Sequence, residues 1–162
     1  YKRQHPVFME LKKKYRSIVY KRRLTLPYGR ALDCLTGDCP WPETQIGREI
    51  GYAMDFYPDL EPRVFLSYER DSWYAPESGL RITFDDAIRF RTADLTLDSD
   101  LWGTALLRPD QVLMELKAPG AIPLWMVRLL TEMGLYKTSF SKYGTAYQIL
   151  LEQEYKGGKR YA

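Results

Sequence analysis

The sequence predicts an α+β fold, an antiparallel β tunnel with flanking α-helices, and three observations support it. Several segments alternate polar and apolar residues with the period of two that is typical of β-strands. Turn-forming segments separate these strands in pairs, as in antiparallel hairpins. A charged stripe then runs along every expected strand. At 162 residues, 45% of them hydrophobic and 28% charged, the chain is long enough for one folded domain.

The strand segments are β-branched or aromatic and are bounded by proline, glycine or other turn residues. Pro27 ends the second segment, and Pro76–Gly79 connects the third to the fourth. The expected strands, in chain order, are Val7–Tyr15, Ser17–Leu26, Val64–Tyr74, Leu80–Thr92 and Gln111–Ala118.

Helical spacing replaces strand alternation in two regions. Leu32 and Leu35 indicate a short helix that ends at Gly37, and the spacing of apolar residues over Ile46–Met54 indicates a second. Two amphipathic helices are expected after the last strand, over Pro123–Met133 and Ser141–Glu154. We therefore expect one tunnel domain over residues 1–155 and a flexible tail over 156–162.

Cysteine content and hydropathy argue against a zinc-binding domain and against a membrane-spanning segment. Cys34, Cys39 and the single histidine His5 are too few soft ligands for a structural zinc site, so two reduced thiols are expected. No run of about 18 apolar residues indicates a membrane span. A soluble, cytoplasmic domain is expected, with a membrane protein as one potential partner.

Each expected strand carries charged residues among positions spaced two apart, so one face of the strand is charged. The opposite faces are expected to hold apolar residues that pack against helices: Phe8, Phe65, Ile82, Phe84 and Leu116. The charged stripes are Glu10, Lys12 and Lys14; Lys21 and Arg23; Tyr68 and Arg70; Arg81, Thr83 and Asp85; and Glu115 and Lys117.

If the sheet closes with its apolar face outward, these charges line a water-filled lumen. Crowded Lys and Arg side chains repel one another, so such a lumen needs an anionic occupant. Basic side chains bind phosphoryl oxygens, whereas carboxylates tolerate them when a divalent cation such as Mg²⁺ or Mn²⁺ bridges the two. The mixed stripes therefore favour a metal–phosphate complex over the alternative, an ordinary solvated face with cross-strand salt bridges.

Other chemistries have less support in the residues. The sequence has no glycine-rich phosphate loop, no serine nucleophile elbow and no histidine-containing metal motif. A basic and aromatic nucleic-acid platform is the rival interpretation, since Tyr20, Tyr68 and Phe90 are able to stack on bases. Glu10 and Glu115 on the basic face disfavour it, so nucleic acid is not the expected partner.

The ordered blocks of the sequence resemble a known family. HPVFMELKKKY, VYKRRL, YERDSW, LRITFDDAIR, VLMELKA and SFSKYGTAY follow one another as in the VTC (vacuolar transporter chaperone) domain of the triphosphate tunnel, or CYTH-like, superfamily. The resemblance implies a tunnel that binds polyphosphate, triphosphate or ATP with Mn²⁺ or Mg²⁺. Eukaryotic relatives form polyphosphate by transfer of the terminal phosphoryl group of ATP, so a polyphosphate polymerase is the first expectation.

The resemblance also assigns roles to residues. Glu115, with Glu10 as a second acidic residue, is similar to the metal-binding position. Four of the basic residues, Lys12, Arg81, Lys117 and Lys142, are expected to be catalytic by stabilising the transferred phosphoryl group. The full set of expected phosphate-binding residues is Lys12, Lys21, Arg23, Arg70, Arg81, Lys117 and Lys142.

One departure from the family pattern leaves the activity open. The family places an acidic–basic first strand and an Arg-x-Arg strand ahead of the block that begins here at His5. The sequence is then either an N-terminally truncated piece or an open or partner-completed tunnel. Three functions remain: polyphosphate polymerase, triphosphatase of the same superfamily, and non-catalytic binding of polyphosphate or nucleic acid.

Overall fold

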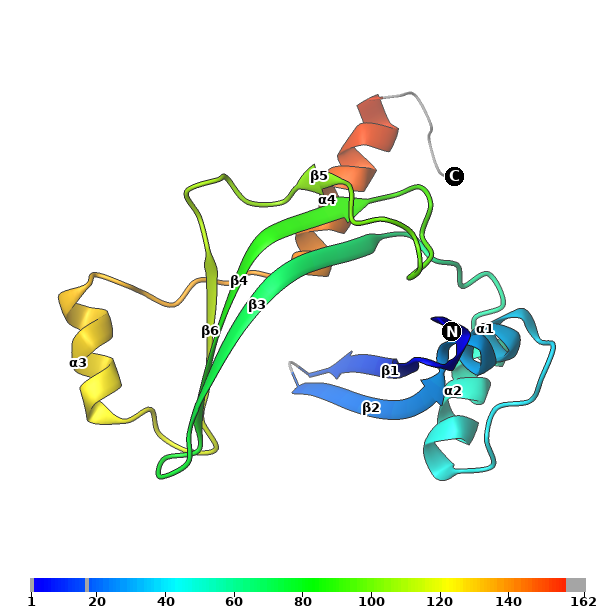
Figure 1. Cartoon of the computed structure of the whole chain (residues 1–162), viewed down its shortest axis with the longest axis horizontal. Helices are drawn as coiled ribbons and strands as arrows, with labels where there is room; N and C mark the ends of the chain where they lie inside the picture. Colours follow the sequence, from blue (N-terminus) through cyan, green and yellow to red (C-terminus); the bar gives the residue numbers. More distant parts are fainter. Residues whose placement is uncertain (1, 17, 157–162) are drawn as a thin grey trace. The chain divides into compact units, whose positions relative to one another are not determined.

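The computed structural model describes residues 2–16 and 18–156, which form helices and antiparallel sheets, as an α+β fold requires (Figure 1). The chain divides into two compact units, Tyr1–Glu61 and Pro62–Ala162. Among the helices of the described ranges, none has the length and apolar character needed to cross a membrane.

The first unit is a long β-hairpin followed by two helices. Pro27 ends the second strand and stands at the N-cap of the first helix, where its missing N–H costs no hydrogen bond. The Thr44 hydroxyl accepts a hydrogen bond from the Gly47 N–H at 3.0 Å and caps the second helix. The elements are η1 (Lys2–Gln4), β1 (Pro6–Tyr15), β2 (Ile18–Pro27), α1 (Tyr28–Thr36) and α2 (Gln45–Phe56).

A small core joins the helices of this unit to the base of the hairpin. The Arg22 guanidinium donates to the Glu49 carboxylate at 3.0 Å and ties β2 to α2. Cys34 and Cys39 are free thiols whose Sγ atoms lie 3.1 Å apart. The buried apolar residues of the unit are Leu26, Tyr28, Ala31, Cys34, Ile50 and Ala53.

The second unit is a four-stranded antiparallel sheet with two helices. The long strand β4 is central and pairs with the other three strands. Figure 1 shows α3 beside the edge strand β6 and α4 near the end of β4 that pairs with β5. The elements are β3 (Phe65–Ala75), β4 (Leu80–Arg91), β5 (Thr104–Ala105), β6 (Leu113–Lys117), α3 (Leu124–Glu132) and α4 (Lys142–Lys156).

A β-bulge interrupts the pairing of β3 with β4. Ser67 lies opposite Arg89, but Glu69 lies opposite Asp86, so β4 has one more residue than β3 in this stretch. Ala87 lies inside the bulge with a φ of 45°, in the left-handed region. The extra residue shifts the alternation of β4 by one position.

The shift changes which residues of β4 share a face. Asp85 lies opposite Arg70 and Phe90 lies opposite Leu66, and residues 66 and 70 point to the same side of β3. Asp85 and Phe90 therefore share a face, although simple alternation over five positions would separate them. Phe90 and Ile88 are both buried, at 3% exposure.

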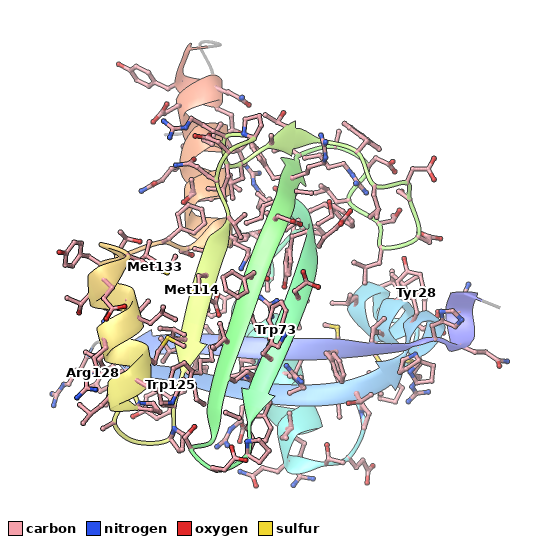
Figure 2. The ribbon with its side chains drawn as sticks, turned by 60° about the vertical axis from the view of Figure 1, so that its left-hand side comes forward. Tyr28, Trp73, Met114, Trp125, Arg128 and Met133 are labelled. Atoms are coloured by element: carbon pink, nitrogen blue, oxygen red, sulfur yellow. The ribbon has the colours of Figure 1, made fainter. Side chains whose placement is uncertain are left out.

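This result corrects the sequence-based assignment of the apolar face. The face with Phe65 and Phe84 was expected to lie under helices. Phe65 is buried at 8% exposure, but Phe84 is 36% exposed and contacts the ring of Trp73, which is 55% exposed, edge to face. Trp73 and Met114, labelled in Figure 2, mark this side of the sheet. Lys142, the first residue of α4, pairs with Asp85, which lies on the opposite side of the sheet from Phe84. The helix therefore covers the side that carries the charges.

The closed tunnel is not found in the ranges that the structure describes. β1 and β2 form a two-stranded sheet, and β3, β4, β5 and β6 form an open four-stranded sheet. The α+β class is confirmed, and closure remains a prediction.

The left-handed conformation of Ala87 gives a test of the bulge. A Cβ atom in this region costs about 1–2 kcal/mol, and glycine avoids that cost at the expense of about 0.5–1 kcal/mol of chain entropy. We expect Ala87→Gly to leave the free energy of unfolding unchanged or to raise it by up to about 1 kcal/mol in urea titrations.

Ala105→Gly is the matched control, because Ala105 is an exposed strand residue without positive φ. It should lose about 0.5–1 kcal/mol. Equal losses at both positions would contradict the bulge geometry.

Candidate phosphate-binding site

The charged side chains of three strands share one face of the sheet in the second unit. Arg70 lies opposite Asp85, and Arg81 and Thr83 lie opposite Lys117 and Glu115. Directly opposite residues point to the same side of an antiparallel pair, and residues two apart on a strand do so as well. We call this surface the β4 face, and define it by Arg70, Arg81, Thr83, Asp85, Glu115 and Lys117.

Asp85 is the centre of the β4 face. Its side chain is fully buried, and its two oxygens accept hydrogen bonds from the Arg70 guanidinium at 2.5 and 2.7 Å. The Lys142 amine lies 2.5 Å from the second oxygen. Burial alone would raise the pKa of Asp85, but the bonds from Arg70 and Lys142 outweigh it and lower the pKa. Asp85 therefore stays ionised and fixes two cations.

Lys142 reaches the β4 face from the start of α4. The Ser141 hydroxyl accepts a hydrogen bond from the Gly144 N–H at 3.1 Å, so Ser141 caps the helix immediately before Lys142. A cation at a helix N-terminus is unfavourable on its own, because the helix dipole is positive there. Its partners are Asp85, Glu115 at 3.5 Å, and the ring of Tyr68 at 4.7 Å from the amine.

Glu115 is the more accessible carboxylate of this cluster. Its side chain is 34% exposed, and one oxygen lies 3.0 Å from the Lys117 amine. The hydrogen bond from Lys117 is the main cause that lowers the pKa of Glu115, against an opposing effect of burial. Glu115 and Lys117 also border a cavity of about 520 Å³ between β6 and the segment that leads from α3 to α4.

Arg81 differs from the other cations of the β4 face. It is exposed and makes no ion pair with a residue that the structure describes. Its register partner is Lys117, and like charges directly opposite each other destabilise a strand pair. Arg81 therefore presents guanidinium donors that an external anion is able to satisfy.

The hairpin of the first unit carries a second charged surface. Glu10 lies opposite Arg23 and Lys12 lies opposite Lys21, so all four share a face. Glu10 pairs with Lys12 at 3.3 Å and with Lys21 and Arg23 at 2.6 Å each. Burial would raise the pKa of Glu10, but the hydrogen bonds from Lys21, Arg23 and Lys12 lower it to about 2. We call this surface the hairpin face.

One apolar assignment in the hairpin is wrong. Phe8 was expected on the side opposite the charges, but it lies two residues from Glu10 on the same strand and pairs with Thr25. The Arg23 guanidinium stacks over its ring at 4.4 Å. Phe8 therefore supports a basic side chain on the hairpin face. The side chain of Lys14 lies outside the described set.

The structure thus brings the predicted residues together as two groups, one in each unit. The metal-binding roles of Glu115 and Glu10 remain predictions. A metal ion would compete with the lysine and arginine side chains that already pair with these two carboxylates. From the sequence, Asp85 was only a residue of a charged stripe, and Tyr68 was a stripe residue with a ring able to stack on bases. The FDD run on β4, in register with an arginine of β3, was the available signal. The β4 face holds Arg70, Arg81, Lys117, Lys142 and Glu115, and the hairpin face holds Lys12, Lys21, Arg23 and Glu10.

Fold and site together define an α+β protein with cation-rich faces on antiparallel strands, each organised around carboxylates. The chain matches the family model of the VTC domain over residues 1–151, and it belongs to that family. The VTC domain is linked to polyphosphate handling, and the CYTH-like superfamily assignment is consistent with it. No curated protein and no solved structure matches the chain.

The burial of Asp85 predicts a large loss of stability on removal of its charge. Asp85→Asn removes the nearer ionic partner of the Lys142 amine, whose side chain is 13% exposed, and leaves it, among the described residues, only Glu115 at 3.5 Å. Breaking a buried pair costs about 3–5 kcal/mol, which urea denaturation will measure. Asp86→Asn is the control, because Asp86 is the exposed neighbour on β4, and it should change stability by less than about 0.5 kcal/mol.

The acid limb of the stability profile gives a second readout of the same variant. A carboxyl whose pKa is lowered in the folded state stabilises the fold at pH values above its ordinary pKa, which is 3.8 for Asp85. This stabilisation is lost as the pH falls through the pKa of the folded state. Asp85→Asn should therefore lose less stability below about pH 4 than the wild type does. Parallel acid limbs for the two proteins would contradict the assigned pairing.

Proposed function

We propose that the chain binds polyphosphate or a nucleoside triphosphate on its basic faces, together with Mn²⁺ or Mg²⁺, and transfers a phosphoryl group. The observation that carries the proposal is the β4 face. Its cations outnumber its carboxylates, and Arg81 and Lys117 stand opposite each other on adjacent strands. Membership of the VTC domain family supports polyphosphate as the anion.

The basic residues have distinct tasks in this proposal. Arg81 and Lys117 are exposed and bind phosphoryl oxygens through charge-assisted hydrogen bonds. Arg70 is pre-oriented, because Asp85 binds it through two bonds, so less side-chain entropy is lost when it meets the ligand. Lys142 reaches the same face from α4 and stabilises negative charge on the transferred group.

Glu115 fits the role of metal ligand. Mg²⁺ in phosphate sites is typically held by one or two carboxylates, with water and phosphate oxygens as the remaining ligands. Glu115 is the partly exposed carboxylate of the β4 face, whereas Asp85 is buried and committed to Arg70 and Lys142. When bound there, the metal would offset charge on the phosphates. Within the described residues no cluster of three or more metal-binding side chains is present, and water and phosphate oxygens would supply the remaining ligands.

The acceptor of the phosphoryl group decides between the activities. Transfer to the end of a phosphate chain makes the protein a polyphosphate polymerase, and transfer to water makes it a triphosphatase. Neither reaction requires a protein nucleophile, because positioning and charge stabilisation supply most of the catalysis of phosphoryl transfer. Polymerase activity is our first proposal, and triphosphatase activity or binding alone is the alternative.

Arg81 gives the sharpest test of anion binding. Tripolyphosphate should raise the melting temperature of the wild type, because a ligand that binds the folded state stabilises it. Arg81→Ala should weaken tripolyphosphate binding by about 1.5–3 kcal/mol, the range for a hydrogen bond to a charged partner. Isothermal titration calorimetry at constant ionic strength will measure the difference.

Arg108→Ala serves as the control. Arg108 is exposed, pairs with Asp110 and lies outside the β4 face, so its removal should leave the affinity close to that of the wild type. An unchanged melting temperature at millimolar tripolyphosphate, with and without Mn²⁺, would contradict the proposal. Equal losses of tripolyphosphate affinity in Arg81→Ala and Arg108→Ala would show that binding is a nonspecific attraction between charges.

Glu115 separates metal-dependent steps from anion binding. Glu115→Gln keeps the size of the side chain but removes the charge that a divalent cation requires. Binding of metal-free tripolyphosphate should be retained or strengthened, because one repulsive charge has gone. The additional thermal stabilisation by Mn²⁺ with tripolyphosphate should disappear, as should any metal-dependent phosphoryl transfer.

The matched control is Glu69→Gln, an exposed glutamate of β3 on the opposite face of the sheet. Its metal-dependent stabilisation should equal that of the wild type. Intact Mn²⁺ dependence in Glu115→Gln would show that Glu115 is only a salt-bridge partner of Lys117.

A further inference from the structure

Thr83 occupies the middle of the β4 face. It lies between Arg81 and Asp85 on β4, opposite Glu115 on β6 and Ser72 on β3. The side chain is 6% exposed. A small uncharged residue is therefore surrounded by the charged groups of the candidate site.

The hydroxyl of Thr83 is buried without a hydrogen-bond partner among the described residues. A buried polar group that is left without a hydrogen bond destabilises the folded state. Valine has nearly the same branched shape and a high preference for strands, and it would fill this position without that cost. The hydroxyl is thus unfavourable for folding at this position, unless something outside the chain bonds to it.

We infer that the Thr83 hydroxyl is a ligand-binding group, which donates a hydrogen bond to an oxygen of the anion on the β4 face. The inference rests on the proposed function and extends its set of binding residues to a neutral donor. A hydroxyl adds no charge, so it strengthens contact with a phosphoryl oxygen without adding to the repulsion among the cations.

The Lys142 amine contacts two carboxylates that are neighbours of Thr83 in the sheet. Its amine bridges Asp85, two residues along β4 from Thr83, and Glu115, the residue opposite Thr83. An anion that binds Lys142 competes with these two carboxylates for the amine. The phosphoryl oxygen then lies between a cation and a neutral donor, and the buried hydroxyl gains the partner that it lacks in the free protein.

The test compares Thr83→Val with Thr83→Ser in two measurements, urea denaturation of the ligand-free protein and calorimetric titration with tripolyphosphate. Thr83→Val should be at least as stable as the wild type, because an unsatisfied hydroxyl has been removed. It should bind tripolyphosphate about tenfold more weakly, as expected for loss of one hydrogen bond. Thr83→Ser should retain most of the affinity. Thr104→Val, at an exposed position of β5, controls for the substitution itself.

Each other outcome overturns the inference. Unchanged affinity in Thr83→Val would remove Thr83 from the site and leave phosphate binding by Arg81 and Lys117 standing. Equal weakening in the Val and Ser variants would assign a role to side-chain shape and not to the hydroxyl. Reduced stability of ligand-free Thr83→Val would show that the hydroxyl is already satisfied, for example by ordered water. Failure of the wild type to bind tripolyphosphate would reject the proposed function, and this inference with it.

Discussion

The buried carboxylate of Asp85 is the constraint on which the second unit depends. A fully buried charge is tolerated only when opposite charges and hydrogen bonds replace its lost hydration. Asp85 meets this need with Arg70 from the neighbouring strand and Lys142 from α4, two residues far apart in the sequence. The carboxylate thereby links β3, β4 and α4 at one point. Any anion that binds nearby meets a set of cations already held in place.

The β-bulge at Ala87 explains why this charge lies under a helix. Beyond the bulge, Phe90 takes the same side as Asp85 and is buried there, so one surface of β4 is apolar at one end and charged at the other. The buried residues of α4, Ala146 and Leu150, give that helix an apolar side as well. The capped first turn then positions Lys142 beside the charged end of the strand. One inserted residue therefore combines core packing and a polar site on one face.

The two units use carboxylates in a similar way. Glu10 gathers Lys12, Lys21 and Arg23 on the hairpin, and its oxygens accept from all three. In the second unit, Asp85 and Glu115 share this task and pair with Arg70, Lys117 and Lys142. A single carboxylate reduces the repulsion among its neighbours but leaves an excess of positive charge. Such an arrangement keeps basic side chains ordered and still attractive to a polyanion.

The sequence by itself determined the local structure and the chemical character of the site. Alternation of residue types predicted the long strands, turn residues predicted the hairpins, and the ordered blocks predicted the VTC domain family that the family model confirms. These features depend on residues that are neighbours in the chain, so the sequence alone predicts them. The same alternation placed Arg70, Arg81, Glu115 and Lys117 on one face, as the register shows.

Only the tertiary structure decided which face is covered and which residues pair. Alternation cannot reveal a bulge, because the shift depends on pairing with β3, and it therefore assigned the helix-covered side of the sheet to Phe84 instead of Asp85. The partnership of Asp85 with Lys142 joins β4 to a helix more than fifty residues later, and the unsatisfied hydroxyl of Thr83 is visible only once its surroundings are known. Burial and long-range ion pairing are properties of the packed chain, and no local pattern of residues encodes them.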